Sequence, residues 1–182
     1  MKHLTVNALV LLMTISFTHV FGQIDTSKHE IQNAPNGNYL IFSGGLSFQK
    51  QFFGELGIIY GKTIWTKEGP GIPILASGLK LATEFNFNSK NFILAPKVCF
   101  EFNTPLLGTR LSIIDFTNFT NHDFKFTPEI GISLGTLVNL FYGYNFSLTE
   151  NRLDNIGTHR FTLTINYDRT FWKIINGKMT PN

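Results

Sequence analysis

The feature that most constrains this chain is an alternation of apolar and polar residues with a period of two, which recurs along most of its length. In segment 92–102 the even positions hold Phe, Leu, Pro, Val, Phe and Phe, and the odd positions hold Ile, Ala, Lys, Cys and Glu. This period places successive side chains on opposite faces of a β-strand. Eight such segments are separated by turn-forming residues: 39–49, 52–65, 74–87, 92–102, 109–119, 124–134, 137–148 and 159–167.

The length of these segments favours a membrane-spanning sheet. A tilted strand crosses a membrane in about 9–11 residues, whereas strands of soluble proteins usually have about 5–6 residues. Beyond residue 22 the sequence contains no apolar run long enough for a spanning helix, and only helices and closed barrels satisfy all backbone groups in hydrocarbon. The predicted fold is therefore an all-β, antiparallel, up-and-down transmembrane β-barrel of about eight strands, occupying 39–173.

The N-terminal residues 1–22 have the features of a secretory signal peptide. Lys2 gives a basic start, a short and mostly apolar run follows, and cleavage after Gly22 places Val20 at position −3. The alternative is a membrane-anchoring helix, but the run is too short and too rich in Thr and Ser. The pattern predicts export through a Sec-type signal peptide, a polar lead-in over 23–38, and a C-terminal tail over 174–182.

The two faces of the predicted strands differ in bulk as well as polarity. Phe, Leu, Ile, Val and Tyr crowd one face in numbers that would overfill the interior of an eight-stranded barrel, so we expect this face to point outward, toward lipid. The other face carries repeated glycines, which would make room for longer neighbours. It also carries nine charged residues, which we expect to form an internal network that plugs the lumen: Glu55, Lys80, Glu84, Lys97, Glu101, Arg110, Lys125, Glu129 and Arg160. The alternative is a soluble barrel whose charged face meets water.

Three local features do not fit a uniform plan. Lys62 has outward parity, so we expect it near a strand end, where a lipid-facing charge is tolerated. The alternation breaks at 114–116, which predicts a β-bulge. Pro96 and Pro128 each remove a ladder hydrogen bond, so a bulge or a strand end is expected at both positions.

With its signal peptide, eight amphipathic strands and modest length, the chain resembles the small bacterial outer-membrane β-barrels of the OmpA-like, OmpX-like and OmpW-like families. The resemblance is one of pattern across 39–172 and includes no sharp motif. It implies an integral protein of the cell outer membrane, with membrane lipid and the outer-membrane assembly machinery as partners, and a monomeric state. Such barrels often end in an aromatic residue, whereas this chain continues past Phe171 and Trp172.

Motifs for catalysis and cofactors are not found in the sequence. Barrels of the lipid A deacylase type carry His and Ser two residues apart, but His159 is followed by Arg160 and Phe161. His122 and Asp123 fall in a predicted turn, and Cys99 is the single cysteine, so neither a catalytic pair nor a metal site is expected. Basic residues are scattered, which argues against nucleic-acid binding. The sequence predicts no enzyme and no cofactor.

Three functions remain open from the sequence. The first is a non-enzymatic outer-membrane barrel with a charge-plugged lumen and an envelope structural or binding role. The second is a passive channel for small apolar solutes, as in OmpW-like barrels. The third is a soluble periplasmic binding barrel of the lipocalin-like kind.

Overall fold

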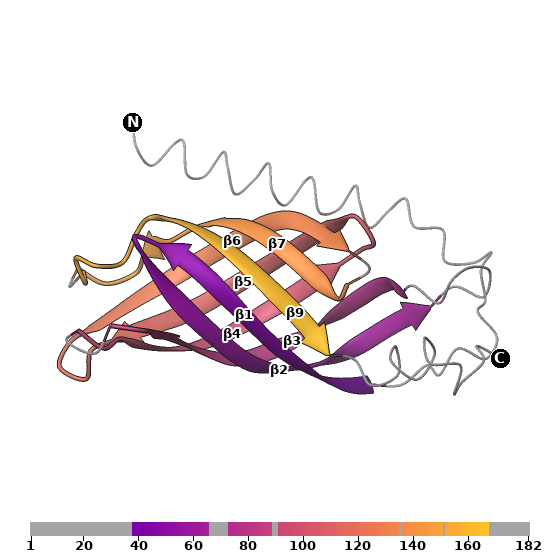
Figure 1. The fold of residues 1–182 in the computed structure, drawn as a ribbon, viewed down its shortest axis with the longest axis horizontal. Helices are drawn as coiled ribbons and strands as arrows, with labels where there is room; N and C mark the ends of the chain where they lie inside the picture. Colours follow the sequence, from indigo (N-terminus) through magenta and orange to yellow (C-terminus); the bar gives the residue numbers. More distant parts are fainter. Residues whose placement is uncertain (1–37, 66–72, 89–90, 135, 151, 168–182) are drawn as a thin grey trace. The chain divides into compact units, whose positions relative to one another are not determined.

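The computed structural model describes residues 38–65, 73–88, 91–134, 136–150 and 152–167, which all belong to one compact unit spanning 33–182. They form a single antiparallel sheet that closes on itself (Figure 1). Its strands are β1 (Asn38–Gln49), β2 (Gln51–Trp65), β3 (Pro73–Asn86), β4 (Leu94–Asn103), β5 (Leu107–Thr117), β6 (His122–Leu134), β7 (Val138–Tyr144), β8 (Phe146–Ser147) and β9 (His159–Tyr167).

β7 and β8 are two pieces of one strand. Both pair with β6 in the same register, since Glu129 faces Gly143 and Lys125 faces Ser147. Thr127 and Pro128 lie on β6 between these two paired stretches, and Pro128 has no N–H to donate to the ladder. Each strand therefore neighbours the next along the chain, and β9 returns to pair with β1. The predicted all-β, antiparallel, up-and-down barrel of eight strands is confirmed.

The strands are strongly staggered around the barrel. Following paired residues from Asn38 through every strand returns to β1 at Phe48, ten residues further along. The residues on this path are Asn38, Lys62, Ser77, Phe102, Thr109, Ile130, Tyr142, Phe161 and Phe48. With about 3.3 Å per residue and about 4.8 Å between strands, this stagger tilts the strands by about 40° from the barrel axis.

The two ends of the barrel differ in what they contain. The loop end, on the left in Figure 1, carries the connections around residues 50, 87–93, 118–121 and 148–158. The opposite end carries the start of β1, the turn at 104–106 and the end of β9. β2 ends at Trp65 and β3 begins at Pro73 at this opposite end, so the β2–β3 connection and the β8–β9 connection leave the barrel at different ends.

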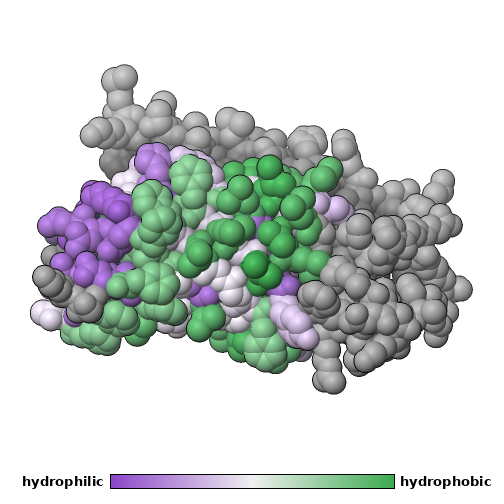
Figure 2. Space-filling view, viewed as in Figure 1, coloured by the Kyte–Doolittle hydropathy of each residue, from purple (hydrophilic) through white to green (hydrophobic). Residues whose placement is uncertain are grey.

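Side chains alternate strictly between the outer face and the interior. In β4, Val98 and Phe100 are half exposed on the outside, whereas Lys97 and Cys99 are buried inside. The same alternation on the other strands produces a belt of apolar side chains around the barrel, visible as the green zone of Figure 2. Polar side chains gather at the loop end of the same view.

The apolar belt has two polar borders. Lys62 is exposed on the outer face near the opposite end, and Asp115 and His122 lie on the outer face at the loop end. Three pairing steps lead from Lys62 to Thr109, and Asp115 is six residues further along β5. At a tilt of about 40°, this path places Asp115 about 24 Å above Lys62 along the barrel axis.

A small apolar core fills the barrel interior at the loop end. Phe53 and Phe116 are fully buried there, with their rings edge to face and their centroids 5.8 Å apart. We call this cluster the apolar plug, and its members are Phe53, Ile93, Ala95, Ile114, Phe116 and Ile156, with Leu153 packed against them.

The prediction of a β-bulge at 114–116 is wrong. β5 pairs with β6 in an unbroken register from Leu107 to Thr117. Ile114 and Phe116 point inward into the apolar plug, and Asp115 points outward and contacts His122 at 2.9 Å. The hydrophobic pattern breaks there because inside and outside exchange polarity at the loop end, while the backbone continues unchanged.

The prolines also leave the register intact. β4 pairs with β5 at Leu94 and again from Lys97 onward in one register, and the pairing lapses between them at Pro96. The expected bulge or strand end is therefore absent at Pro96, and at Pro128 the partner strand is interrupted instead.

Several predicted segments lie outside the described residues. These are the signal peptide 1–22, the lead-in up to residue 37, the end of the predicted barrel range at 168–173 and the tail 174–182. Asn38, assigned to the lead-in, is the first residue of β1. Among the described residues, no helix has the length and apolar character required to cross a membrane.

We expect the apolar plug to stabilise the barrel more than an equally large outward side chain does. Phe116→Ala should lower the free energy of unfolding by about 3–5 kcal/mol, because it opens a cavity between buried rings. Phe100→Ala, whose ring is 51% exposed on the outer face, is the matched control. Urea titration in detergent micelles measures the free energy of unfolding of both variants. Equal losses for the two variants would show that the plug is not a packed core.

Candidate functional site

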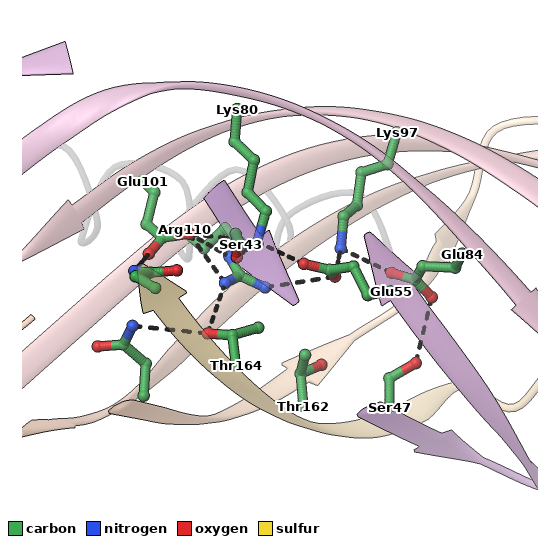
Figure 3. A network of polar contacts seen from close by, with 12 residues as sticks. Ser43, Ser47, Glu55, Lys80, Glu84, Lys97, Glu101, Arg110, Thr162 and Thr164 are labelled. Atoms are coloured by element: carbon green, nitrogen blue, oxygen red, sulfur yellow. Dashed lines mark hydrogen bonds and ion pairs between the residues drawn. The ribbon is translucent and has the colours of Figure 1, made fainter. Parts of the chain in front are cut away.

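The inward positions of the strands carry a concentration of buried charge. All nine charged residues predicted for the interior are placed there by the structure, and none is more than 5% exposed. They come from six of the eight strands, and Figure 3 shows how six of them point toward one another: Glu55, Lys80, Glu84, Lys97, Glu101 and Arg110. Strand parity places each of them on the face opposite the apolar belt.

Glu55 lies at the centre of this cluster. Its carboxylate contacts the ammonium groups of both Lys80 and Lys97. Lys97 Nζ also lies 2.6 Å from Glu84 Oε1, and Lys80 Nζ lies 4.0 Å from Glu101 Oε2. Each lysine therefore bridges two carboxylates.

Two arginines connect the remaining carboxylates. Arg110 Nη2 lies 2.8 Å from Glu101 Oε2, and its Nη1 lies 3.5 Å from Glu129 Oε2. Arg160 reaches Glu84 Oε1 at 2.6 Å and Glu129 Oε1 at 3.3 Å. Acids and bases thus alternate around a closed cycle, which we call the charge ring: Glu55, Lys97, Glu84, Arg160, Glu129, Arg110, Glu101 and Lys80.

Lys125, the ninth predicted residue, lies apart from the charge ring. Its Nζ contacts Asp123 Oδ2 at 2.9 Å, closer to the loop end. Asp123 is fully buried and was not among the predicted interior residues, since it was assigned to a turn. Its odd position, shared with Lys125 and Glu129 on β6, is the signal that would have found it. With Asp123 included, the described interior holds five acidic and five basic side chains.

Hydroxyl groups add hydrogen bonds to the charge ring. Ser43 Oγ accepts a hydrogen bond from Lys80 Nζ at 2.7 Å, and Ser47 Oγ donates one to Glu84 Oε2 at 3.2 Å. Thr162 Oγ1 donates to Glu129 Oε1 at 2.8 Å. Hydrogen bonds of this kind offset part of the cost of burying the charges.

The small inward residues make room for the long ones. A Cβ atom on Gly143 would lie 2.6 Å from Glu129 Cγ and 3.1 Å from Arg160 Cγ. The guanidinium group of Arg110 lies over the ring of Phe141, at 4.4 Å from the ring centroid. The charge ring is therefore packed against both backbone and aromatic surface.

The carboxylates and the cations of the charge ring neutralise one another. Every carboxylate of the charge ring touches two cations, so none is free to act as a general base. A cavity of about 20 Å³, next to Glu101, Asn103 and Asn166 toward the opposite end, holds little more than one water molecule. The geometry fits a closed and electrically neutral interior.

The residues considered for catalysis are separated by the fold. His122 and Asp123 lie on opposite faces of β6, and His122 Nδ1 contacts Asp115 at the outer surface. Cys99 is buried inside the barrel. Within the described ranges, no three His, Cys, Asp or Glu side chains gather in a group that could hold a metal ion.

No family model matches this chain, and neither the curated proteins nor the solved structures contain a significant match to it. The fold and the charge ring therefore define the class, an eight-stranded antiparallel β-barrel with an ion-paired interior, and the function is inferred from the geometry alone.

We expect the barrel to depend on charge balance inside the ring. Glu84→Gln should lower the free energy of unfolding by about 3–5 kcal/mol, because Lys97 and Arg160 lose a shared carboxylate in a buried setting. Adding Lys97→Met restores neutrality and should recover part of that loss. Denaturant titration of the single and double variants in micelles gives the coupling free energy between Glu84 and Lys97.

Glu150→Gln, at an exposed position of the loop end, is the control for the loss of one negative charge. A loss from Glu84→Gln no larger than that from Glu150→Gln would contradict the account of the charge ring.

Proposed function

We propose that this chain is an integral β-barrel protein of a bacterial outer membrane, with a non-enzymatic structural or binding role. Its lumen is plugged by the charge ring and sealed at the loop end by the apolar plug. The apolar belt carries the proposal: its height of about 24 Å matches the outward apolar band of about 25 Å that membrane barrels present to lipid.

The exposed side chains support a lipid environment over water. Large apolar residues cover the outer face throughout the apolar belt, including Leu56 at 64% and Ile130 at 56% exposure. Soluble monomers rarely expose a contiguous apolar surface of this extent. A soluble lipocalin-like barrel would place these residues inside, where the charge ring lies.

Aromatic side chains near the strand ends support the same proposal. Phe52, Phe87 and Tyr167 are each at least half exposed on the outer face. Aromatic residues at the two edges of an apolar band are typical of the membrane–water interface. Lys62 and Asp115 lie at these edges, where a charged side chain is tolerated.

The filled lumen favours a structural or binding role over a passive channel for apolar solutes. A solute passing along the axis would have to separate the ion pairs of the charge ring and then displace the apolar plug. The closed sheet also leaves no edge strand for pairing with a second chain, which supports a monomer. Membrane lipid and the assembly machinery for outer-membrane barrels are the partners that this proposal requires.

A depth-dependent cost of outward arginine is the sharpest test of the membrane proposal. Ile130→Arg, near the middle of the belt, should destabilise the barrel in lipid vesicles by about 2–4 kcal/mol. Leu134→Arg, four residues along the same strand at the edge of the belt, should cost about 0–1 kcal/mol. Both side chains are exposed to a similar degree, 56% and 61%. Reversible urea unfolding from vesicles gives the two values, and equal small effects would contradict the proposal.

Cell fractionation and electrophoresis test the location and the closed lumen. We expect recovery in the outer-membrane fraction and a compact band in unheated SDS that shifts on boiling. In planar bilayers the protein should produce no stepwise ion conductance. Recovery in the soluble periplasm without detergent would refute the membrane assignment, and steady conductance steps would refute the plugged lumen.

A further inference from the structure

Three connections at the loop end enclose a depression that the proposed function does not explain. Its volume is about 530 Å³, within the range of small-molecule sites. We call it the rim pocket. Its walls come from 91–93, 118–121 and 152–155, and its main side chains are Asn91, Phe92, Phe119, Asn121, Arg152 and Asn155.

Phe119 is the unusual residue of the rim pocket. Its backbone φ is 67°, in the left-handed region that bulky side chains rarely adopt, and its side chain is 70% exposed. An exposed ring in this conformation contributes little to folding. Strained backbone of this kind is often found at ligand sites.

The turn holds Phe119 in place. Asn118 Oδ1 accepts hydrogen bonds from the backbone N–H groups of Thr120 and Asn121, and Thr117 Oγ1 accepts one from the N–H of Phe119. The ring of Phe92 lies nearly parallel to that of Phe119, at an interplanar angle of 9° and a centroid distance of 6.2 Å. The two rings offer apolar faces at the edge of the pocket.

The opposite wall is also fixed. Ile156 is anchored in the apolar plug, and the N–H of Leu153 donates to Asp123 Oδ2 at 3.1 Å. Lys50 Nζ donates to the carbonyl of Asp154 at 2.9 Å. Because these contacts tie the connection to the barrel mouth, the wall is ordered before any ligand binds, which favours affinity.

The polar lining consists mainly of amides. Asn91, Asn121 and Asn155 are exposed, and Arg152 adds a planar donor group. Amides offer both donors and acceptors, as hydroxyl groups require. A ligand that presents hydroxyls on its edge and C–H groups on its face fits amides beside aromatic rings.

We propose that the rim pocket binds a saccharide, with sugar C–H faces on Phe92 and Phe119 and sugar hydroxyls on the surrounding amides. The inference rests on the proposed membrane location, which places the pocket beside the lipid surface. The saccharide can be a free oligosaccharide or the headgroup of a glycolipid in the same membrane, because the recognised chemistry is shared.

The experiment has two arms, one for each source. In the first, barrel refolded in micelles is titrated by calorimetry with maltopentaose, mannopentaose and chitopentaose. In the second, barrel in phosphatidylethanolamine nanodiscs is compared with barrel in nanodiscs that also contain lipopolysaccharide, using NMR shifts of the loop-end amides. Binding in the first arm indicates a free saccharide, and shifts confined to the second indicate a glycolipid headgroup.

Phe119→Asn is the decisive variant. Asn tolerates a positive φ, so the barrel should keep its urea midpoint, while the dissociation constant should rise about ten-fold with loss of the stacking face. Asn155→Ala should also weaken binding without unfolding. Leu106→Asn, an exposed apolar turn residue at the opposite end, is the matched control and should bind as the parent does.

Heat-modifiability of every sample separates this inference from the membrane proposal. If the barrel is folded and neither arm shows binding, the saccharide site is refuted and the membrane proposal stands. Binding that Phe119→Asn leaves unchanged would likewise overturn the assignment of the rim pocket.

Discussion

Four carboxylates and four cations share an interior that water barely enters, and each is stable there because two neighbours of opposite sign flank it. Glu55 with Lys80 and Lys97, and Glu129 with Arg110 and Arg160, are examples. Desolvation of any one of these groups alone would cost several kcal/mol. The alternation of sign around the charge ring offsets that cost, and it requires the strand register that brings six strands to one level. The strand register, the closure of the sheet and the charge balance of the interior therefore depend on one another.

The second organising feature is the exchange of polarity along the barrel axis. In the middle of the barrel the interior is ionic and the exterior apolar. At the loop end the interior contains an apolar cluster, with Phe53 and Phe116 buried, while Asp115 and His122 face outward. In the proposed membrane setting this is the level at which the barrel would leave lipid and meet water, and the buried apolar side chains form a seal at that mouth. The connection at 148–158 adds Ile156 to that seal.

Much of the fold could be predicted from the sequence, because a period of two is a strong signal when it is repeated eight times. The same parity was enough to place the nine charged residues on one face. Two failures have physical reasons. The break at 114–116 suggested a backbone irregularity, but hydrophobicity cannot distinguish a bulge from a change of environment. The predicted strand 124–134 begins two residues after the observed start of β6, which leaves Asp123 in the predicted turn, because turns and strand ends have similar compositions.

The details of the site needed three-dimensional information. Sequence spacing does not reveal which carboxylate each of the lysines and arginines reaches, since Arg160 and Glu84 are far apart in the chain and meet only across the lumen. The rim pocket was also invisible, because its walls come from three connections that only barrel closure brings together. A positive φ at Phe119 has no signature in the sequence.

The most direct measurement of the central claim uses two neighbouring residues of β4 that face opposite ways. A nitroxide at Phe100→Cys, in a Cys99→Ser background, is tested by power-saturation EPR in lipid vesicles, and the native Cys99 thiol is tested with a water-soluble maleimide. The account predicts that the nitroxide meets oxygen dissolved in lipid rather than aqueous nickel complex, and that Cys99 stays unmodified until the barrel is unfolded. Ready access of nickel to position 100, together with rapid labelling of Cys99, would contradict it.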